Sequence, residues 1–189
     1  IVCSGNAENF DFKLHQAFVY EQIESVKKLF KIDYNTFFIR GKGLRGYFDN
    51  LFALKEKINE YKPDVVHAHF GLSGLLAVFQ KKTPVIITFH GSDAAIPIIR
   101  LFSKITATFS QFNIFVSSKI QLKIGLNKRF AIIPCGINLD IFQPVETITT
   151  RKKLNLDSNK PLILFASGFD NYVKNSPLAF SAVKQIDQT

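Results

Sequence analysis

Two kinds of apolar pattern alternate along the chain. Short β-branched runs such as VIITF at 85–89 are too short for a helix and are typical of buried parallel strands. Between such runs apolar residues recur at helical spacing, as Val19, Ile23, Val26 and Phe30 do. The runs predict strands at residues 1–3, 34–39, 64–68, 85–89, 113–117, 131–134 and 161–167. The periodic stretches predict helices at residues 17–30, 47–61, 73–80, 97–108 and 177–186, with another short helix between the strands at 113–117 and 131–134.

Strands that alternate with helices predict βαβ units and an α/β fold with a doubly wound parallel sheet. We expect one such domain over residues 1–143, in which Ser73 caps the helix at 73–80. Residues 144–160 hold Pro144, a threonine cluster and the basic triplet RKK, and are expected to be a linker. Residues 161–189 then supply only the first strand and helix of a second domain. Because one strand cannot form a sheet, we expect this second domain to be truncated and the chain to be a fragment.

Three of the four histidines lie at the ends of two predicted strands. His67 and His69 lie in the run DVVHAHF, and His90 follows VIITF. Ligands of such sheets bind beyond the carboxyl ends of the strands, so His69 and His90 are expected at the binding edge. His67 and His69 share one face of a strand and could ligate a metal ion together, or His67 could be a hydrogen-bonded core residue. His15 and the aspartates show no spacing that completes a metal site, so none is predicted.

The net charge of the chain limits the kinds of binding partner that are expected. The net charge of +9 and the pI near 9.6 favour an anionic partner, which could be nucleic acid, a phosphate-bearing ligand or an anionic bilayer. The lysines are scattered and no helix-turn-helix, RNP or zinc-finger spacing accompanies them, so no nucleic acid is expected. Cys3 and Cys135 are far apart, which indicates reduced thiols and a cytoplasmic protein. No apolar run reaches the roughly 18 residues of a membrane span.

The glycines bear on phosphate binding. The loop after the first strand, SGNAENF, has one glycine, Gly5, and does not match the GxGxxG dinucleotide pattern. The GKG at 41–43 does not have P-loop spacing. Nicotinamide enzymes and P-loop NTPases are therefore not expected. Gly5 either lets the backbone approach an anionic ligand or is a plain turn residue.

Four motifs occur in order along the chain: DVVHAHFGLSGLLA, PVIITFHGSD, IIPCGINLDIF and ILFASGFDNYVKN. Together they resemble the retaining GT-B glycosyltransferases of family 4, over essentially the whole chain. The resemblance implies two Rossmann-like domains, the first on the acceptor side and the second on the donor side. It implies transfer of a sugar, with retention, from a nucleotide diphosphate sugar to a saccharide or lipid-linked acceptor in polysaccharide or glycolipid biosynthesis. The nucleotide sugar is a co-substrate, and no cofactor and no metal ion are implied.

The resemblance also implies roles for individual residues. His90 would face the transferred sugar or the acceptor hydroxyl and is the candidate catalytic residue. Gly5 and Lys174 would bind the donor diphosphate, the lysine by offsetting the charge that builds on the leaving group. His69 and Asp93 would lie on the acceptor side. Asp93 could orient His90 or cap the helix that follows.

The chain departs from the family pattern at three places. Ser167, Gly168 and Phe169 stand where a glycine and an arginine are usual, and Cys135 stands where an asparagine is usual. The glutamate pair that grips the donor is absent, because the chain stops at Thr189. These departures keep a second interpretation open: a non-catalytic Rossmann-like module that binds an anionic saccharide or phosphate ligand. We expect no turnover from these residues alone.

The segment RGKGLRGYFDNLFALKEK combines cations with aromatic side chains. It contains Arg40, Lys42, Arg45, Tyr47, Phe48 and Phe52. Such a segment could dock on an anionic membrane, which would place the protein peripherally at the inner face of that membrane, or it could hold a lipid-linked acceptor. The alternative is an ordinary amphipathic helix whose phenylalanines pack on the sheet.

Overall fold

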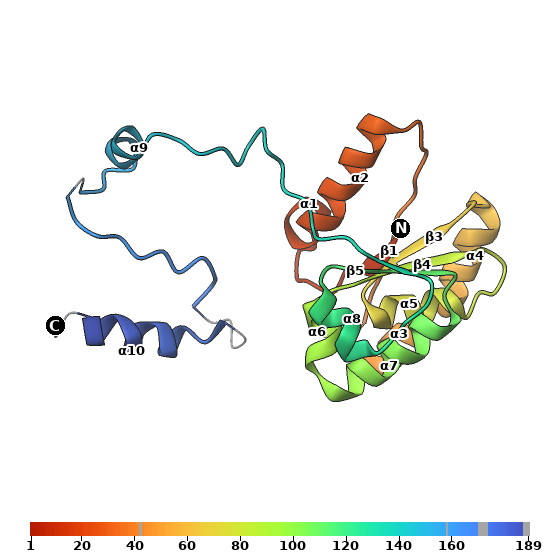
Figure 1. Ribbon diagram of the computed structural model, residues 1–189. Helices are drawn as coiled ribbons and strands as arrows, with labels where there is room; N and C mark the ends of the chain where they lie inside the picture. Colours follow the sequence, from red (N-terminus) through yellow and green to blue (C-terminus); the bar gives the residue numbers. More distant parts are fainter. Residues whose placement is uncertain (42, 158, 170–173, 187–189) are drawn as a thin grey trace. The chain divides into compact units, whose positions relative to one another are not determined.

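The structure is a computed structural model that describes residues 1–41, 43–157, 159–169 and 174–186. The chain divides into two compact units, Ile1–Leu139 and Asp140–Thr189 (Figure 1). The sequence predicted a boundary after residue 143, four residues beyond this division. Each unit is described below by itself.

A parallel sheet forms the centre of the first unit. Within the described residues it has six strands in the order β2-β1-β3-β4-β5-β6, and every neighbouring pair runs parallel. The strands are β1 (Val2–Ser4), β2 (Phe37–Ile39), β3 (Val66–His69), β4 (Val85–Phe89), β5 (Phe112–Phe115) and β6 (Phe130–Ile132). The register places Val2 beside Phe37 on one side and beside Ala68 on the other. The predicted parallel α/β architecture is confirmed.

Helices cover both faces of this sheet. The helices of the first unit are α1 (Phe12–His15), α2 (Ala17–Leu29), α3 (Gly43–Phe48), α4 (Leu51–Tyr61), α5 (Gly71–Val78), α6 (Gly91–Ala95), α7 (Pro97–Phe109) and α8 (Ser118–Ile124). Helix α2 lies on one face, whereas α5, α7 and α8 lie on the other (Figure 1). This two-sided cover makes the sheet doubly wound and Rossmann-like.

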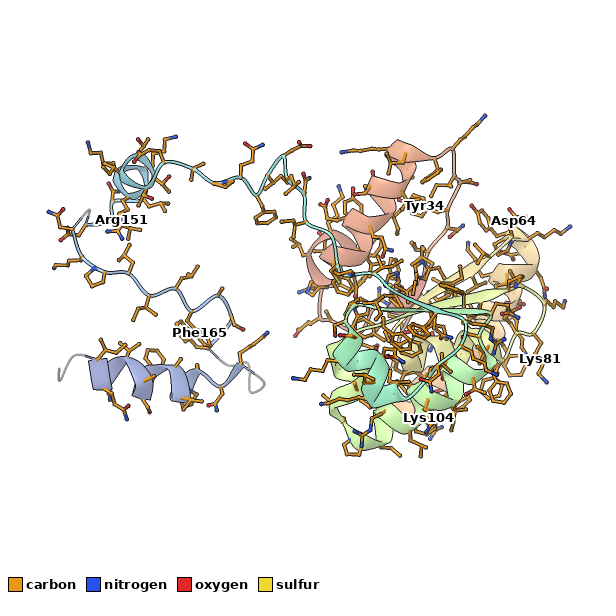
Figure 2. The ribbon with its side chains drawn as sticks, viewed as in Figure 1. Tyr34, Asp64, Lys81, Lys104, Arg151 and Phe165 are labelled. Atoms are coloured by element: carbon orange, nitrogen blue, oxygen red, sulfur yellow. The ribbon has the colours of Figure 1, made fainter. Side chains whose placement is uncertain are left out.

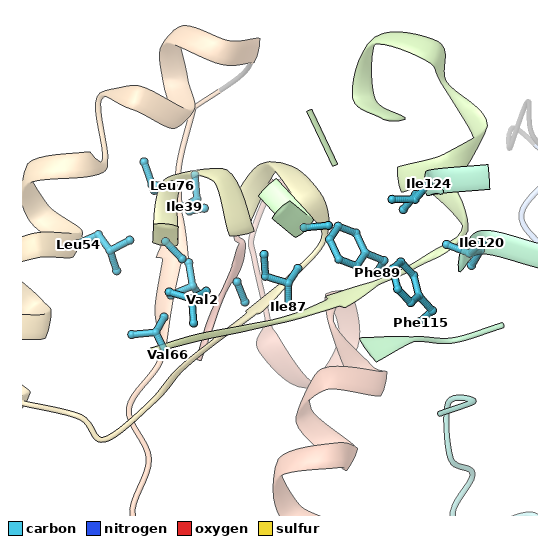
Figure 3. Packing of buried hydrophobic residues seen from close by; sticks show 14 of the residues in the cluster. Val2, Ile39, Leu54, Val66, Leu76, Ile87, Phe89, Phe115, Ile120 and Ile124 are labelled. Atoms are coloured by element: carbon cyan, nitrogen blue, oxygen red, sulfur yellow. The ribbon is translucent and has the colours of Figure 1, made fainter. Parts of the chain in front are cut away.

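The main core lies between the sheet and the helices α4, α5, α7 and α8. Its cluster joins alternate residues of the central strands to apolar residues of these helices, such as Leu54 of α4 and Ile120 of α8 (Figure 3). The rings of Phe89 and Phe115 stack there with their centroids 5.1 Å apart. Complete burial of such a side chain stabilises the fold by about 1.5–3 kcal/mol. The β-branched runs are therefore strands because both faces of the sheet are buried.

Helices α5 and α7 approach each other closely. A Cβ atom on Gly71 would lie 2.9 Å from the Cα atom of Ser103, and one on Gly74 would lie 2.9 Å from the Cγ2 atom of Thr106. Ser103, Thr106 and Ala107 are the buried residues of α7. Helix α7 thus turns small side chains inward, against the glycines of α5.

Two predicted elements near the amino terminus differ in the structure. The loop expected before residue 17 contains α1, which Asp11 caps by accepting a 2.8 Å hydrogen bond from Lys13 N. The helix expected at 47–61 is two helices, because α3 already begins at Gly43 and the chain turns before α4. At this turn the Asn50 amide donates to the carbonyl oxygens of Arg40 at 2.7 Å and Gly46 at 2.5 Å. These bonds join the break to the end of β2.

Two further expectations are wrong, and the expected linker has structure of its own. Ser73 does not cap α5: the helix begins at Gly71, and Ser73 is buried inside it. Residues 161–166 form no strand, and Leu164 is 87% exposed. A strand needs a neighbouring strand to satisfy its backbone hydrogen-bonding groups. The expected linker contains a helix, α9 (Thr147–Lys153), which Glu146 caps. A glutamate is not among the side chains that usually cap helices, so this signal is weak in the sequence.

The second unit consists, in its described residues, of α9, an irregular segment and α10 (Ser176–Ile186). The helix predicted at 177–186 is confirmed. In the irregular segment the rings of Phe165 and Phe169 stack, and Phe169 stacks in turn on Phe180 of α10.

Candidate functional site

The carboxyl ends of the strands meet at one edge of the sheet, and the strand order reverses there. From β1 the chain moves outward to β2, then returns past β1 to β3 and continues to β6. Such a reversal opens a crevice beyond the carboxyl ends of the two inner strands, where ligands of open α/β sheets bind. Gly5 follows β1, His69 ends β3 and His90 follows β4. The fold therefore brings three of the sequence-predicted residues to this edge.

His69 and His90 contact each other directly. The Nδ1 atom of His69 lies 3.3 Å from the Nε2 atom of His90, and the two rings stack with centroids 5.6 Å apart. His69 is 1% exposed, whereas His90 reaches the surface with 9% of its area. In a hydrogen bond between two neutral imidazoles one ring nitrogen donates and the other accepts, and the tautomers of the two rings set which does which.

His67 lies on the same face of β3 as His69. Its Nε2 atom lies 2.8 Å from Thr88 Oγ1 on β4, and its ring centroid lies 4.5 Å from that of His69. Of the two interpretations of His67, the hydrogen-bonded strand residue agrees with this contact. Within the part of the chain that the structure describes, no three side chains of His, Cys, Asp or Glu are placed to hold a metal ion.

Burial keeps these histidines neutral. It lowers the pKa of His90 from 6.5 to about 4 and also lowers the pKa of His67 to about 4. The pKa of His69 lies well below its usual range, mainly through burial and then through its two histidine neighbours. At neutral pH the edge therefore presents uncharged imidazoles, which can each donate one hydrogen bond and accept one.

Asp93 holds the backbone around the histidine pair. Its Oδ2 atom accepts a 2.7 Å hydrogen bond from His90 N, and its Oδ1 atom accepts a 2.8 Å bond from Gly71 N. It thereby caps α6, one of the two predicted alternatives, and joins the start of α5 to the end of β4. Asp93 is 1% exposed, and burial raises its pKa from 3.8 to about 6. Its carboxylate faces backbone N–H groups rather than solvent.

Two phenylalanines that sequence reasoning missed surround His90. The rings of Phe18 on α2 and Phe70 after β3 lie with centroids 4.7 Å and 4.6 Å from the His90 ring. Phe70 has φ = 71°, which is uncommon for a bulky residue and marks a constrained turn between β3 and α5. Its position directly after HAH was the only available signal. Phe18 lies on α2, far from His90 in the sequence, and no local sequence pattern indicated that the two rings would be in contact.

A cavity of about 460 Å³ borders the other side of the histidines. Its lining includes Ile23 and Val26 of α2, Ile58 of α4, and His67 and His69 of β3. This space lies behind the edge at which the predicted site residues gather. His67 and His69, which line the cavity, thus lie between it and the carboxyl edge of the sheet.

Gly5 lies beside an arginine that the sequence analysis treated only as part of the membrane segment. A Cβ atom on Gly5 would lie 2.8 Å from Phe38 Cβ and 3.2 Å from Arg40 Cζ. The Arg40 guanidinium donates a hydrogen bond to the Gly5 carbonyl and lies 4.9 Å from the ring of Phe10. Tight packing therefore already requires a glycine here. Arg40 adds a cation to the same edge, and its place directly after β2 is a signal that could have been used.

Lys174 belongs to the second unit. It is exposed and lies two residues before α10. Residues 170–173, which precede it in the motif ILFASGFDNYVKN, lie outside the described residues. Ser176 Oγ, at the start of α10, donates a 2.6 Å hydrogen bond to Phe169 O.

The predicted membrane segment is only partly exposed. Tyr47 packs against the main core, whereas Phe48 is 43% and Phe52 79% exposed, so Phe52 does not pack on the sheet. Arg45 is exposed on α3, and Lys42 lies outside the described residues. None of the helices in the described ranges has the length and apolar character to cross a membrane.

Comparison with known proteins gives one result. The profile of the family described as Glycosyltransferase Family 4 matches residues 15–141, about two thirds of the chain. The match spans β2 to β6 and includes His67, His69, His90 and Asp93. A search of the curated proteins finds no match.

Proposed function

This chain belongs to glycosyltransferase family 4, and from that premise we propose that it serves the transfer of a sugar from a nucleotide diphosphate sugar to a saccharide or lipid-linked acceptor. We propose further that the transfer retains the anomeric configuration and belongs to polysaccharide or glycolipid biosynthesis. Membership of this family makes the protein a glycosyltransferase. Its donor, its acceptor and the stereochemistry of transfer are proposals for experiment to test.

One observation carries the proposal: the neutral His69–His90 pair stands at the carboxyl edge of β3 and β4 with an aromatic wall of Phe18 and Phe70. Aromatic rings commonly contact the apolar face of a ligand, and a neutral imidazole can bind a hydroxyl group either as donor or as acceptor. This combination suits an uncharged polyol such as a sugar. In the proposal His90, which reaches the surface, binds a hydroxyl of the transferred sugar or of the acceptor.

The leaving diphosphate needs positive charge or backbone dipoles in the transition state. In the proposal Gly5 lies against the diphosphate and Lys174 offsets its charge, as the family pattern implies. Arg40 supports the first of these assignments, because its guanidinium bonds the Gly5 carbonyl and adds a cation at that position. His69 and Asp93 are proposed on the acceptor side, where Asp93 acts by holding the backbone N–H groups of His90 and Gly71.

The test is a transfer assay with the protein expressed in and purified from its source cells, because no turnover is expected from residues 1–189 alone. Radiolabelled UDP-glucose, UDP-N-acetylglucosamine and GDP-mannose are each incubated with lipid and oligosaccharide extracts of the source cells, and the product linkage is read by NMR. We expect one donor to give a product of retained configuration, and His90→Ala to lower kcat/KM by about a hundredfold, as loss of one transition-state hydrogen bond does. His15→Ala, an exposed change on α1, serves as the matched control. Inverted product, or full activity of His90→Ala, would contradict the proposal.

A second candidate function is a non-catalytic module for an anionic saccharide or phosphate ligand. It is favoured by one observation: the Arg40 guanidinium lies beside Gly5 at the carboxyl edge of the sheet and supplies a cation there. Calorimetric titration with inorganic pyrophosphate distinguishes the two. Binding that Arg40→Ala weakens, together with no transfer to any acceptor, would favour the module over the enzyme.

The proposal also places the protein in the cytoplasm with peripheral contact to an anionic membrane. The net charge of +9 supports this partner. Fractionation of source cells with an antibody to the chain tests it: protein found only in the supernatant at low salt would contradict membrane contact.

A further inference from the structure

Helix α7 exposes large apolar residues along one side. Ile98, Leu101, Ile105 and Phe109 follow one another at intervals of three and four, so they lie in one stripe, and all four are exposed. Phe109 is 69% exposed. The residues that α7 buries instead are the small Ser103, Thr106 and Ala107. We call the four large residues the α7 stripe.

This orientation follows from the packing of α7 on α5. The glycines of α5 leave no space for side chains larger than those of Ser103 and Thr106 between the two helices. Turning the stripe inward would force four large side chains into that contact, which close-packed interiors do not accommodate. The exposed stripe is therefore a consequence of a tight helix pair and is not a frayed or loosely held surface.

The surroundings of the stripe carry charge of one sign. Between Asp93 and Asp140 the sequence contains no acidic residue and six basic ones: Arg100, Lys104, Lys119, Lys123, Lys128 and Arg129. Lys104 lies on the side of α7 away from the sheet (Figure 2). Helix α8, which carries exposed Lys119 and Lys123 and exposed Leu122, packs against α7. The Lys104 ammonium lies 4.0 Å from the position of a Cβ on Gly125 at the end of α8.

An apolar stripe beside cations, without carboxylates, is what an interfacial helix presents to an anionic bilayer. The apolar side chains enter the acyl boundary while the lysines remain among anionic headgroups. We propose that the α7 stripe, with the basic residues of α7 and α8, is the surface by which this protein docks on an anionic membrane. This inference rests on the membrane contact of the proposed function and assigns a surface to it, and it does not depend on whether the carboxyl edge of the sheet transfers sugars.

Two other arrangements fit the observations less well. The segment around α4 also exposes an aromatic residue, Phe52, but Asp49, Glu56 and Glu60 are exposed in the same segment and would repel anionic headgroups. A second copy of the chain could cover the α7 stripe, but an isologous contact would bring two basic surfaces together. An anionic bilayer is the partner whose charge complements the surface.

The experiment is co-sedimentation of the protein with vesicles. One set contains phosphatidylcholine alone, and the other contains about 30 mol% phosphatidylglycerol, which makes the surface anionic. We expect binding only to the anionic vesicles and its loss at about 0.5 M sodium chloride, because salt screens the lysines. Leu101→Glu should weaken partitioning about tenfold or more, since it removes an apolar side chain and adds a repelled charge. Lys104→Gln should weaken it about fivefold.

The matched control is Phe52→Glu, which places the same new charge at an exposed aromatic residue of α4. It should bind anionic vesicles as the unchanged protein does. Circular dichroism verifies that each variant is folded, which is expected because the replaced side chains are exposed. Equal binding by Leu101→Glu, loss of binding by Phe52→Glu alone, or no binding to either vesicle would overturn the proposal. A dimer in light scattering that Leu101→Glu dissociates, without vesicle binding, would assign the stripe to a second copy.

Discussion

Acidification is expected to destabilise the first unit, because its buried histidines resist protonation. His90 has a pKa of about 4 in the folded protein and an ordinary value of 6.5 when exposed. Between these values the unfolded chain binds a proton that the folded chain does not. The stabilisation is therefore fully present above pH 6.5 and is lost as the pH falls from 6.5 towards 4. Moving from about pH 7 to about pH 4.5 should cost about 2 kcal/mol of unfolding free energy at His90 alone.

Other buried titrating groups also change the free energy of unfolding between these two pH values. His67 has the same folded pKa of about 4 and contributes a similar loss, and the lowered pKa of His69 acts in the same direction. Asp93 opposes them, because burial raises its pKa from 3.8 to about 6 and the folded state then gains a proton as the pH falls. Over the same pH interval the protonation of Asp93 raises the free energy of unfolding by about 2 kcal/mol. His67, His90 and Asp93 together predict a net loss of about 2–3 kcal/mol, to which His69 adds.

The assay is urea unfolding followed by circular dichroism at about pH 7 and pH 4.5. We compare the unchanged protein with His90→Gln, which removes one titrating group while retaining a polar side chain. The variant should lose about 2 kcal/mol less than the unchanged protein between the two pH values. His15→Gln, on the exposed side of α1, should behave as the unchanged protein does. If stability holds or rises on acidification, or if His90→Gln shows the same loss, the reasoning about buried neutral histidines fails.

Three other changes test the packing around the site by urea unfolding. Gly71→Ala should destabilise the protein by about 1–3 kcal/mol, because the new methyl group would lie 2.9 Å from the Cα atom of Ser103, whereas Gly91→Ala, which faces open space, should not. Asp93→Asn should lower the free energy of unfolding by about 1–3 kcal/mol, since a side chain that accepts from two buried N–H groups loses one acceptor oxygen. An unchanged urea midpoint would show that Asp93 does not cap α6. Asn50→Ala should lower the free energy of unfolding by about 1 kcal/mol, because the hydrogen bonds at the α3–α4 break are lost. An unchanged free energy of unfolding would show that the Asn50 amide does not hold this break.

The parallel sheet could be predicted from the sequence, because strands buried on both faces need continuous β-branched runs and alternate with amphipathic helices. The meeting of His69 and His90 at one edge followed from the same pattern. Parallel strands end at one edge of a sheet, so residues that follow successive strands are near each other. Helix boundaries were less certain, since the turn at Asn50 depends on side-chain bonds to the end of β2.

The roles of several side chains required the tertiary structure. Phe18 and Arg40 lie far along the chain from their partners His90 and Gly5, and no local pattern pairs them. The strand predicted at 161–167 is not formed for the complementary reason: its apolar residues suit a strand, but no strand among the described residues pairs with it.

The sequence by itself thus determined the parallel α/β architecture, the edge of the sheet at which His69 and His90 gather, and the cationic charge of the molecule. Those properties depend on local periodicity, on chain order and on composition. Only the tertiary structure decided which nitrogen atoms of the histidines face each other, and which side of α7 faces solvent. The glycines of α5 lie about one helix and one strand earlier in the chain than the small residues of α7. Their close contact, and the exposed stripe that results, arise from packing between segments that local pattern cannot relate.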